Sequence, residues 1–293
     1  MPIDLDKVLR LSSANADEKA MLADLQMNIL DGHGRRSTRN IFLNFLEVGK
    51  GRAFVRAIAE HVTSAQQQFD EARIYRNSGK SGGPVVGLML SSAGYAFLGR
   101  EDIMPQPEDG GAFAEGLLAR GALLNDPPGS KLEPSYRERI HAMILIGGEP
   151  DGEEKWTSAE VELKEDEILG LADPSSFDPI VMEVGRAIFR RDAGGRAEGI
   201  EHFGYVDGRS QPLMIEELID RERDENGGID IWDPRFPLRQ VLVPDPGAAD
   251  ADTGFGSFFV FRKLEQDVRG FKDAEEKLGK QLGIDELAGA FLV

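Results

Sequence analysis

The chain has 293 residues, of which 41% are hydrophobic and 29% charged, so it can bury one large core or two smaller ones. Its 52 acidic residues outnumber the 34 basic ones, and the formal net charge of −18 argues against nucleic acid and anionic membrane surfaces as partners. Cysteine does not occur, which excludes disulfides, thiolate metal sites and cysteine nucleophiles.

Residues 1–22 lack the basic leader and apolar run of a secretory signal. No apolar stretch approaches the roughly 20 residues that a membrane-spanning helix requires. Because the chain also lacks cysteine, which suits a reducing compartment, we expect a cytoplasmic location.

The first half of the chain alternates strand and helix signals. Residues 21–30 form a short amphipathic segment, and residues 40–48 are rich in isoleucine, phenylalanine and leucine, as a buried strand would be. Apolar side chains then recur at helical spacing, which predicts one helix between residues 50 and 75 with the following residues facing inward: Phe54, Ile58, Val62, Ala65 and Phe69. Further elements are predicted as a strand at 85–91, a short helix at 92–99 and another helix at 111–124.

The second half is less regular. Its sequence predicts a strand at 141–148, an acidic helix at 157–172 and a strand at 177–190. Residues 213–253 are polar and loop-like, and residues 256–267 are typical of a strand that runs into a helix. No glycine fingerprint for phosphate follows the first strand, so we expect an α+β fold with helices on one face of the sheet rather than a doubly wound nucleotide fold.

The histidines do not indicate a metal site by their spacing. There are four, at positions 33, 61, 141 and 202, and no pair has the separation of a helical metal motif. We expect His33, His61 and His141 to serve structural roles.

The stretch EHFGYVDGRSQP (residues 201–212) contains the strongest candidate for chemistry. Asp207 stands in a glycine-rich turn, where an Asp-Gly pair is common for backbone reasons alone. Other polar candidates lie close by, namely His202, Arg209, Ser210 and Gln211. A serine nucleophile is disfavoured because the G-x-S-x-G elbow is missing, while a carboxylate pair for hydrolysis stays open.

Three stretches together resemble a known family. GYVDGRSQP (204–212), MNILDGHGRRSTRNIFLNF (27–45) and GSFFVFRKLEQDVRGF (256–271) are similar, in the same order, to segments of dye-decolorising (DyP-type) haem peroxidases of the longer type. The resemblance implies two ferredoxin-like α+β halves of the dimeric α+β-barrel type. We expect a 1–38 extension, a 39–212 ferredoxin-like domain that ends in the GYVDG loop, and a 213–293 linker that starts a truncated second, haem-binding half.

The resemblance also implies a site. Asp207 would be the distal acid and base above haem b, with Gly208, Arg209, Ser210 and Gln211 lining the same face, and His202 and Phe203 holding the loop. The substrates would be hydrogen peroxide and organic donors such as dyes or phenols. Donors too large for the pocket would be oxidised at surface residues, for which Trp156, Trp232, Tyr136 and Tyr205 are candidates.

The family's proximal histidine and distal arginine come after the part that this chain resembles. We therefore assign no iron ligand here, and the apolar ending IDELAGAFLV (284–293) suggests that a continuation or a second polypeptide supplies both groups. A carboxylate with an ordinary pKa near 4 is ionised in mild acid, so the peroxidase optimum should be acidic.

Two other functions stay open. The same fold could act as a non-catalytic interaction module that binds no haem. An acidic hydrolase built on paired carboxylates has only the composition in its favour.

Overall fold

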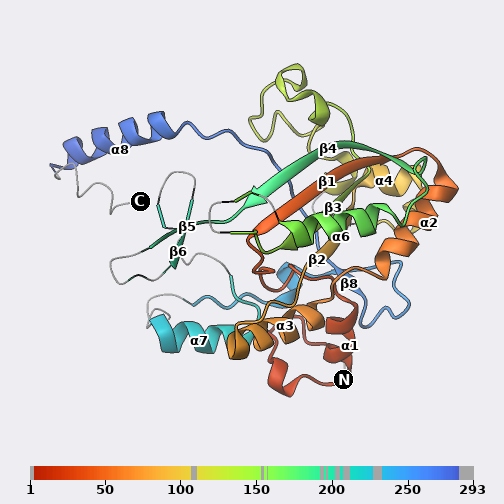
Figure 1. Cartoon of the computed structure of the whole chain (residues 1–293), viewed down its shortest axis with the longest axis horizontal. Coiled ribbons are helices and arrows are strands. Elements are labelled where there is room, and N and C mark those ends of the chain that lie inside the picture. The colour runs from red at the N-terminus through yellow and green to blue at the C-terminus, as the bar shows by residue number, and fades with distance from the viewer. Residues whose placement is uncertain are drawn as a thin grey trace. The chain divides into compact units, whose positions relative to one another are not determined.

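The structure, a computed structural model, describes residues 3–106, 111–152, 155–156, 158–191, 195, 197–201, 205–206, 212–226 and 233–283. The chain divides into two compact units (Figure 1). The first comprises Met1–Arg186 with Gln211–Phe259, and the second comprises Ala187–Ser210 with Val260–Val293. The domain boundaries predicted at 38/39 and 212/213 stay a prediction.

A four-stranded antiparallel sheet forms the centre of the first unit. Its strands are β1 (Ser37–Phe45), β2 (Val85–Leu90), β3 (Ala142–Gly148) and β4 (Phe177–Arg186), in the order β2-β3-β1-β4. Each inner strand is paired antiparallel with its neighbours, which is the arrangement of a ferredoxin-like βαββαβ unit. The expected α+β class with an antiparallel sheet is confirmed.

Two helices cover one face of this sheet (Figure 1). They are α2 (Val48–Ala59) and α6 (Ala159–Leu169). Alternate residues of β1 point toward them, and side chains one or two helical turns apart point back, as the two periodicities require. The buried set that results comprises Ile41, Leu43, Phe45, Phe54, Ile58, Ile144, Ile146, Val161 and Ile168. Burying each such side chain stabilises the fold by roughly 1.5–3 kcal/mol.

The single helix expected between residues 50 and 75 is wrong, because the chain forms two helices there. α2 ends at Ala59 and α3 spans Ala65–Ser78. Between them the Thr63 N–H donates to the Val86 carbonyl at 2.9 Å, and Ser64 caps α3 by accepting from Gln67 N at 3.1 Å. The apolar spacing continues through the break because Ala65 and Phe69 pack into a second core.

The remaining helices of the first unit are shorter or more polar. They are α1 (Ala16–Asp24), capped by Asn15, α4 (Ser92–Phe97), α5 (Ala112–Glu115) and α7 (Glu216–Asn226). Short 3-10 turns lie at Leu11–Ser13, Glu101–Ile103, Gly129–Lys131, Pro134–Tyr136 and Leu238–Gln240. The helix expected at 111–124 is therefore mostly wrong. It stops after one turn at Gly116, whose φ of 76° does not continue a helix.

A second core joins segments that are far apart in the sequence. It is formed by Leu9, Met21, Leu22, Leu25, Leu30, Ala65, Met214, Ile215, Leu238 and Leu242. The segment 213–253, expected to be loop-like, contributes to this core and also contains α7 and β7 (Val243–Pro244), which pairs with β8 (Phe255–Gly256). The loop-like prediction was wrong for α7. Most residues of this helix are charged and few of its apolar side chains are buried, although Ile219 is fully buried.

The second unit contains a hairpin and a helix. The hairpin pairs β5 (Ile188–Arg191) with β6 (Ala197–Ile200), and the helix is α8 (Val268–Leu282), capped by Asp267. The strand and helix expected within 256–267 are wrong, since β8 ends at Gly256 and no regular element follows before Val268.

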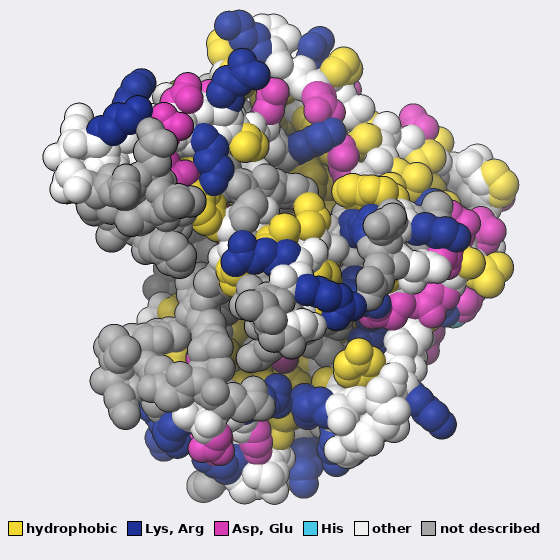
Figure 2. Space-filling model, turned by 60° about the vertical axis from the view of Figure 1, so that its left-hand side comes forward, with side chains coloured by type: hydrophobic (Ala, Val, Ile, Leu, Met, Phe, Trp, Pro, Cys, Tyr) yellow, Lys and Arg dark blue, Asp and Glu magenta, His cyan; other side chains and the backbone are white. Residues whose placement is uncertain are grey.

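The described surface carries its charges in mixed groups. Figure 2 shows lysine and arginine side chains dispersed among acidic and apolar ones on the face drawn. Arg36 pairs with Glu149 at 2.7 Å, and Arg39 pairs with Glu162 at 2.6 Å. Among the described residues, no helix combines the length and the apolar character needed to cross a membrane.

Candidate functional site

The residues expected to line the site lie outside the described part of the chain. This applies to Asp207, Gly208, Arg209, Ser210 and Gln211, and also to His202, Phe203 and Trp232. The structure describes the segments that lead into this loop and out of it.

The entry to the loop belongs to the second unit. The chain reverses after β6, where Glu201 N donates to the Tyr205 carbonyl at 2.8 Å. Ile200 and Val206 then form an antiparallel bridge. Val206, the residue directly before Asp207, is therefore held beside β6.

Tyr205 is held by one face of α8. Lys272 Nζ donates to the Tyr205 hydroxyl at 2.6 Å, and the hydroxyl donates to Glu275 Oε1. Lys272 also lies 3.9 Å from the centre of the Tyr205 ring, which Phe271 contacts edge-on at 5.9 Å. The hydrogen bond with Tyr205, together with Glu275, raises the pKa of Lys272.

The exit from the loop belongs to the first unit and is paired on both sides. Leu213 N donates to the Pro234 carbonyl at 2.8 Å, and Phe236 N donates back to the Leu213 carbonyl at 3.0 Å. On the opposite side Leu9 N donates to the Met214 carbonyl at 2.9 Å, and Glu216 N donates to the Leu9 carbonyl at 2.9 Å. Residues 213–215 thus form the middle of three parallel segments.

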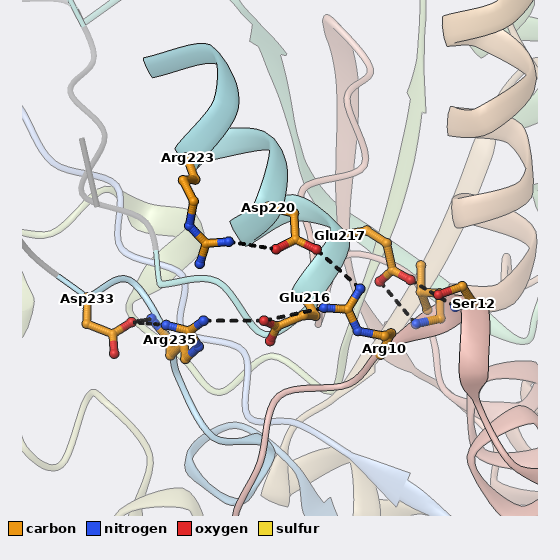
Figure 3. A network of polar contacts seen from close by, with 9 residues as sticks. Arg10, Ser12, Glu216, Glu217, Asp220, Arg223, Asp233 and Arg235 are labelled. Carbon is orange, nitrogen blue, oxygen red and sulfur yellow. Dashed lines mark hydrogen bonds and ion pairs between the residues drawn. The ribbon is translucent and has the colours of Figure 1, made fainter. Parts of the chain in front are cut away.

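A polar network surrounds the exit at the start of α7 (Figure 3). Glu216 Oε1 lies 3.5 Å from Arg10 NH2 and 3.3 Å from Arg235 NH2, so one carboxylate oxygen serves two guanidinium groups. Arg10 NH1 also reaches Asp220 Oδ2 at 3.2 Å, and Arg235 NH1 reaches Asp233 Oδ1 at 3.2 Å. The hydrogen bond with Glu216 raises the pKa of Arg235.

Glu217 fastens the N-terminal residues to the same helix. Its two carboxylate oxygens accept from Leu11 N at 3.1 Å and from Ser12 N at 2.8 Å. Burial acts to raise the pKa of the Glu217 carboxyl, but the hydrogen bonds from Ser12 and Leu11 outweigh it and hold the pKa below its usual value.

The second predicted motif, around GHGR, forms a partly buried structural turn. His33 Nδ1 accepts from Arg35 N at 3.0 Å, and Arg35 pairs with Glu71 of α3 at 2.5 Å. Arg35 Nε donates to the Gly83 carbonyl at 2.9 Å, next to β2. Burial and then the charge of Arg35 lower the pKa of His33. This motif therefore joins the start of β1 to α3 and β2.

Comparison with known proteins identifies relatives of this chain. No family model matches the chain. The chain is 39% identical over 297 residues to the multifunctional dye peroxidase DyP2 of Amycolatopsis sp. (strain ATCC 39116 / 75iv2), covering 100% of this chain and 60% of that protein. The chain belongs to the dye-decolorising (DyP-type) peroxidase family. The resemblance expected from three short stretches is confirmed.

Solved structures of DyP-type peroxidases agree. DyP2 from Amycolatopsis superposes with a TM-score of 0.87 at 38% identity, covering 99% of this chain and 60% of that one. A DyP-type peroxidase from Anabaena sp. superposes with a TM-score of 0.82 at 32% identity, covering 100% and 62%. This chain therefore spans about three fifths of the length of the DyP-type relatives that it matches, and it shares their ferredoxin-like fold.

DyP-type peroxidases are haem proteins, so the described histidines can be tested as iron ligands. His33 Nδ1 and His141 Nδ1 each accept a backbone N–H, from Arg35 and Phe45 respectively, both at 3.0 Å. A neutral imidazole that accepts at Nδ1 carries its proton on Nε2, which then has no lone pair for a metal. His61, just after α2, differs from them, because its Nδ1 lies 3.2 Å from Glu167 Oε1 of α6 and this contact leaves Nε2 uncommitted. The Nδ1 hydrogen bonds of His33 and His141 therefore argue against both residues as iron ligands.

The sequence reading missed the network around Glu216. A signal was present, because Ile215 and Ile219 are one helical turn apart in a stretch that is otherwise rich in charged residues. The partners of that network, Arg10 and Arg235, could not be found this way because they lie on other segments.

Proposed function

We propose that this chain works as part of a haem b-dependent peroxidase, which reduces hydrogen peroxide and oxidises dyes or phenolic donors. The observation that carries the proposal is the match along the whole chain to a protein named as a multifunctional dye peroxidase. The superposition with two DyP-type structures at 38% and 32% identity supports it.

In this proposal Asp207 is the acid and base of the reaction. Haem, when bound, supplies the redox chemistry. The Asp207 carboxylate takes a proton from one oxygen of hydrogen peroxide and returns it to the departing oxygen. Gly208 lets the backbone approach the cofactor closely, and Arg209, Ser210 and Gln211 line the same loop. Val206 pairs with Ile200 and Leu213 pairs with Arg235, so the residues before and after this loop each have a backbone partner within their own unit.

The proximal histidine and the distal arginine are proposed to lie in the part of the relatives' length that this chain does not cover. Either a continuation of the polypeptide or a second polypeptide would carry them. The hydrogen bonds of His33 and His141 support this, because both imidazoles are committed to backbone contacts.

Bulky donors are proposed to react at the surface rather than beside Asp207. Tyr205 is the best supported of the four candidates, since a phenol that loses an electron must also lose its proton and Glu275 is hydrogen-bonded to receive it. Tyr136 has a similar partner, as its hydroxyl donates to Glu183 Oε1 at 2.7 Å. Trp156 is 54% exposed, and Arg186 lies 5.7 Å from its ring centre.

The test compares Asp207→Asn with the unchanged protein, purified with haem and with any companion polypeptide. We expect an unchanged Soret band and a loss of about 100-fold or more in kcat/KM for peroxide, in line with general acid–base contributions. The unchanged protein should be most active below pH 7, because Asp207 must be ionised to act as a base. Asp178→Asn, at an exposed position on β4, is the matched control and should change neither property.

Two results would contradict the proposal. Full activity of Asp207→Asn would remove Asp207 from the mechanism. A protein that binds no haem in any pairing would favour the alternative, a non-catalytic module of the same fold.

A further inference from the structure

We propose that Lys272 and Glu275, on one face of α8, control the oxidation of Tyr205: Glu275 takes the proton that the phenol releases, and Lys272 raises the oxidising strength of the tyrosyl radical that results. Lys272 thereby determines which dyes the protein oxidises at this position. The inference rests on the proposed function, because it deepens the assignment of Tyr205 as a surface oxidation site. Every contact that carries it lies within the second unit.

Tyr205 is held through its backbone as well as its side chain. Its carbonyl accepts from Glu201 N at 2.8 Å, and the next residue, Val206, is bridged to Ile200 at the end of β6. The ring packs edge-on against Phe271 of α8, with 5.9 Å between the ring centres. The phenol is therefore oriented against α8, which proton transfer to a neighbouring side chain requires.

Glu275 is placed to accept the phenol proton. The Tyr205 hydroxyl donates to Glu275 Oε1, and the Glu275 side chain is only 11% exposed. A phenol that loses an electron becomes a far stronger acid, so its proton leaves with the electron. A carboxylate that already accepts the hydroxyl hydrogen bond receives this proton without rearrangement.

The oxidation of Tyr205 moves one electron and one proton. The electron goes to the cofactor that peroxide has oxidised, the hydroxyl proton goes to Glu275, and a neutral tyrosyl radical remains. A dye at the surface then gives one electron to the radical, and Glu275 returns the proton. Tyr205 and Glu275 are thus restored, and the dye is oxidised by one electron.

Lys272 places a positive charge on the same phenol. Its Nζ donates to the Tyr205 hydroxyl at 2.6 Å and lies 3.9 Å from the centre of the ring. The same Nζ lies 3.4 Å from Glu275 Oε2, so the ammonium and the carboxylate balance each other before oxidation. The hydrogen bond with Tyr205, together with Glu275, raises the pKa of Lys272, which keeps the ammonium charged near neutral pH.

Oxidation removes this balance of charge. The negative charge of Glu275 disappears when it takes the proton, and the ring that attracts the cation loses an electron. Both changes leave the charge of Lys272 without a counterpart. Lys272 therefore makes Tyr205 harder to oxidise and makes its radical a stronger oxidant, so the dyes that lose an electron least readily should depend on Lys272 most.

The experiment uses the holoenzyme, with any companion polypeptide, and three substitutions: Glu275→Gln, Lys272→Met and Lys272→Arg. Glu275→Gln keeps a side-chain oxygen that accepts from the Tyr205 hydroxyl but cannot take its proton. The matched controls are Glu276→Gln and Lys277→Met, at exposed positions of the same helix. Circular dichroism checks that each variant keeps its fold.

Two measurements separate the phenol from the reaction with peroxide. In the first, a photoexcited ruthenium complex with an added electron acceptor oxidises the protein without peroxide. The tyrosyl radical is measured by electron paramagnetic resonance, with Tyr205→Phe as the blank. In the second, kcat is measured with peroxide and two bulky dyes, one hard to oxidise and one easy to oxidise.

For Glu275→Gln we expect the yield of the Tyr205 radical to fall about tenfold or more, because a positioned acceptor contributes at least this much to proton transfer. For Lys272→Met the radical yield should rise. The ratio of kcat for the hard dye to kcat for the easy dye should fall about fivefold, the factor that a cation–π contact of an exposed lysine provides. Lys272→Arg should restore most of this ratio, and both controls should match the unchanged protein.

A radical yield in Glu275→Gln equal to that in Glu276→Gln would remove Glu275 as the proton acceptor. An unchanged dye ratio in Lys272→Met would overturn the role of Lys272 in specificity. The proposed function fails separately, if photo-oxidation gives the expected order of variants while peroxide supports no dye oxidation in any of them. In that case the redox assignment of Tyr205 and its two partners stands without the peroxidase.

Discussion

Leu9 and Ile215 lie opposite each other in a parallel bridge although 206 residues separate them in the chain, and both side chains are almost completely buried. Leu9 belongs to the N-terminal segment, residues 3–13, and Ile215 lies directly before α7. This contact therefore ties the N-terminal residues to the segment that begins α7.

Shortening the Leu9 side chain should destabilise the first unit. Leu9→Ala removes buried methyl groups and leaves a cavity in the second core, for which a loss of about 2–5 kcal/mol in the free energy of unfolding is typical. Urea denaturation followed by circular dichroism measures this loss. Leu46→Ala is the control, since Leu46 is 58% exposed and should lose much less. Equal losses for both variants would show that Leu9 is not part of a packed core.

His141 should make the first unit less stable in acid. Its ring packs against Phe45 and Phe97, its Nδ1 accepts from Phe45 N, and burial lowers its pKa. The folded state therefore binds a proton less readily than the unfolded state, whose histidine has a pKa near 6.5. This contribution to stability is present above about pH 6.5 and is lost as the pH falls below it toward the folded-state value.

The measurement is the free energy of unfolding between pH 7.5 and 5, the range about the ordinary histidine pKa. His141→Gln cannot titrate and keeps an oxygen that can accept from Phe45 N, so its stability should fall less steeply than that of the unchanged protein. Parallel slopes for the two proteins would mean that His141 is not the group responsible.

Tyr205 should affect the rate at which large donors are oxidised but not the rate of reaction with peroxide. Tyr205→Phe removes the hydroxyl that is hydrogen-bonded to Glu275 and Lys272, so the ring no longer has a proton to release on oxidation. We expect kcat for a bulky dye to fall several-fold, while the rate of reaction with peroxide stays the same. Tyr75→Phe is the control, because Tyr75 is 57% exposed on α3. A bulky-dye rate that is unchanged in Tyr205→Phe would exclude this tyrosine as an oxidation site.

The sheet of the first unit could be predicted from the sequence because its strands carry a local signal. The runs at 40–48, 85–91 and 141–148 correspond to β1, β2 and β3 within a few residues, since buried strands concentrate apolar side chains over short stretches. The helix at 157–172 was likewise found as α6. The break between α2 and α3 was not, because hydrogen bonds from residues distant in sequence, such as that from Thr63 to Val86, create it.

The polar elements were the hardest to predict. α7 and α8 are dominated by charged residues, and each buries only a few side chains, so hydrophobic periodicity gave a weak signal. The polar side chains of both helices contact residues elsewhere in the chain, namely Arg10 and Arg235 for α7 and Tyr205 for α8.

By itself the sequence was sufficient to predict the α+β class, the family and the choice of Asp207 as the candidate acid and base, because these depend on local patterns and short motifs. Only the tertiary structure revealed that residues 3–13 pair with the segment after that motif, and that Glu216 pairs with both Arg10 and Arg235. Pairing between segments some 200 residues apart is decided by the closure of the whole chain and by the burial of side chains such as Leu9 and Ile215, neither of which leaves a local pattern.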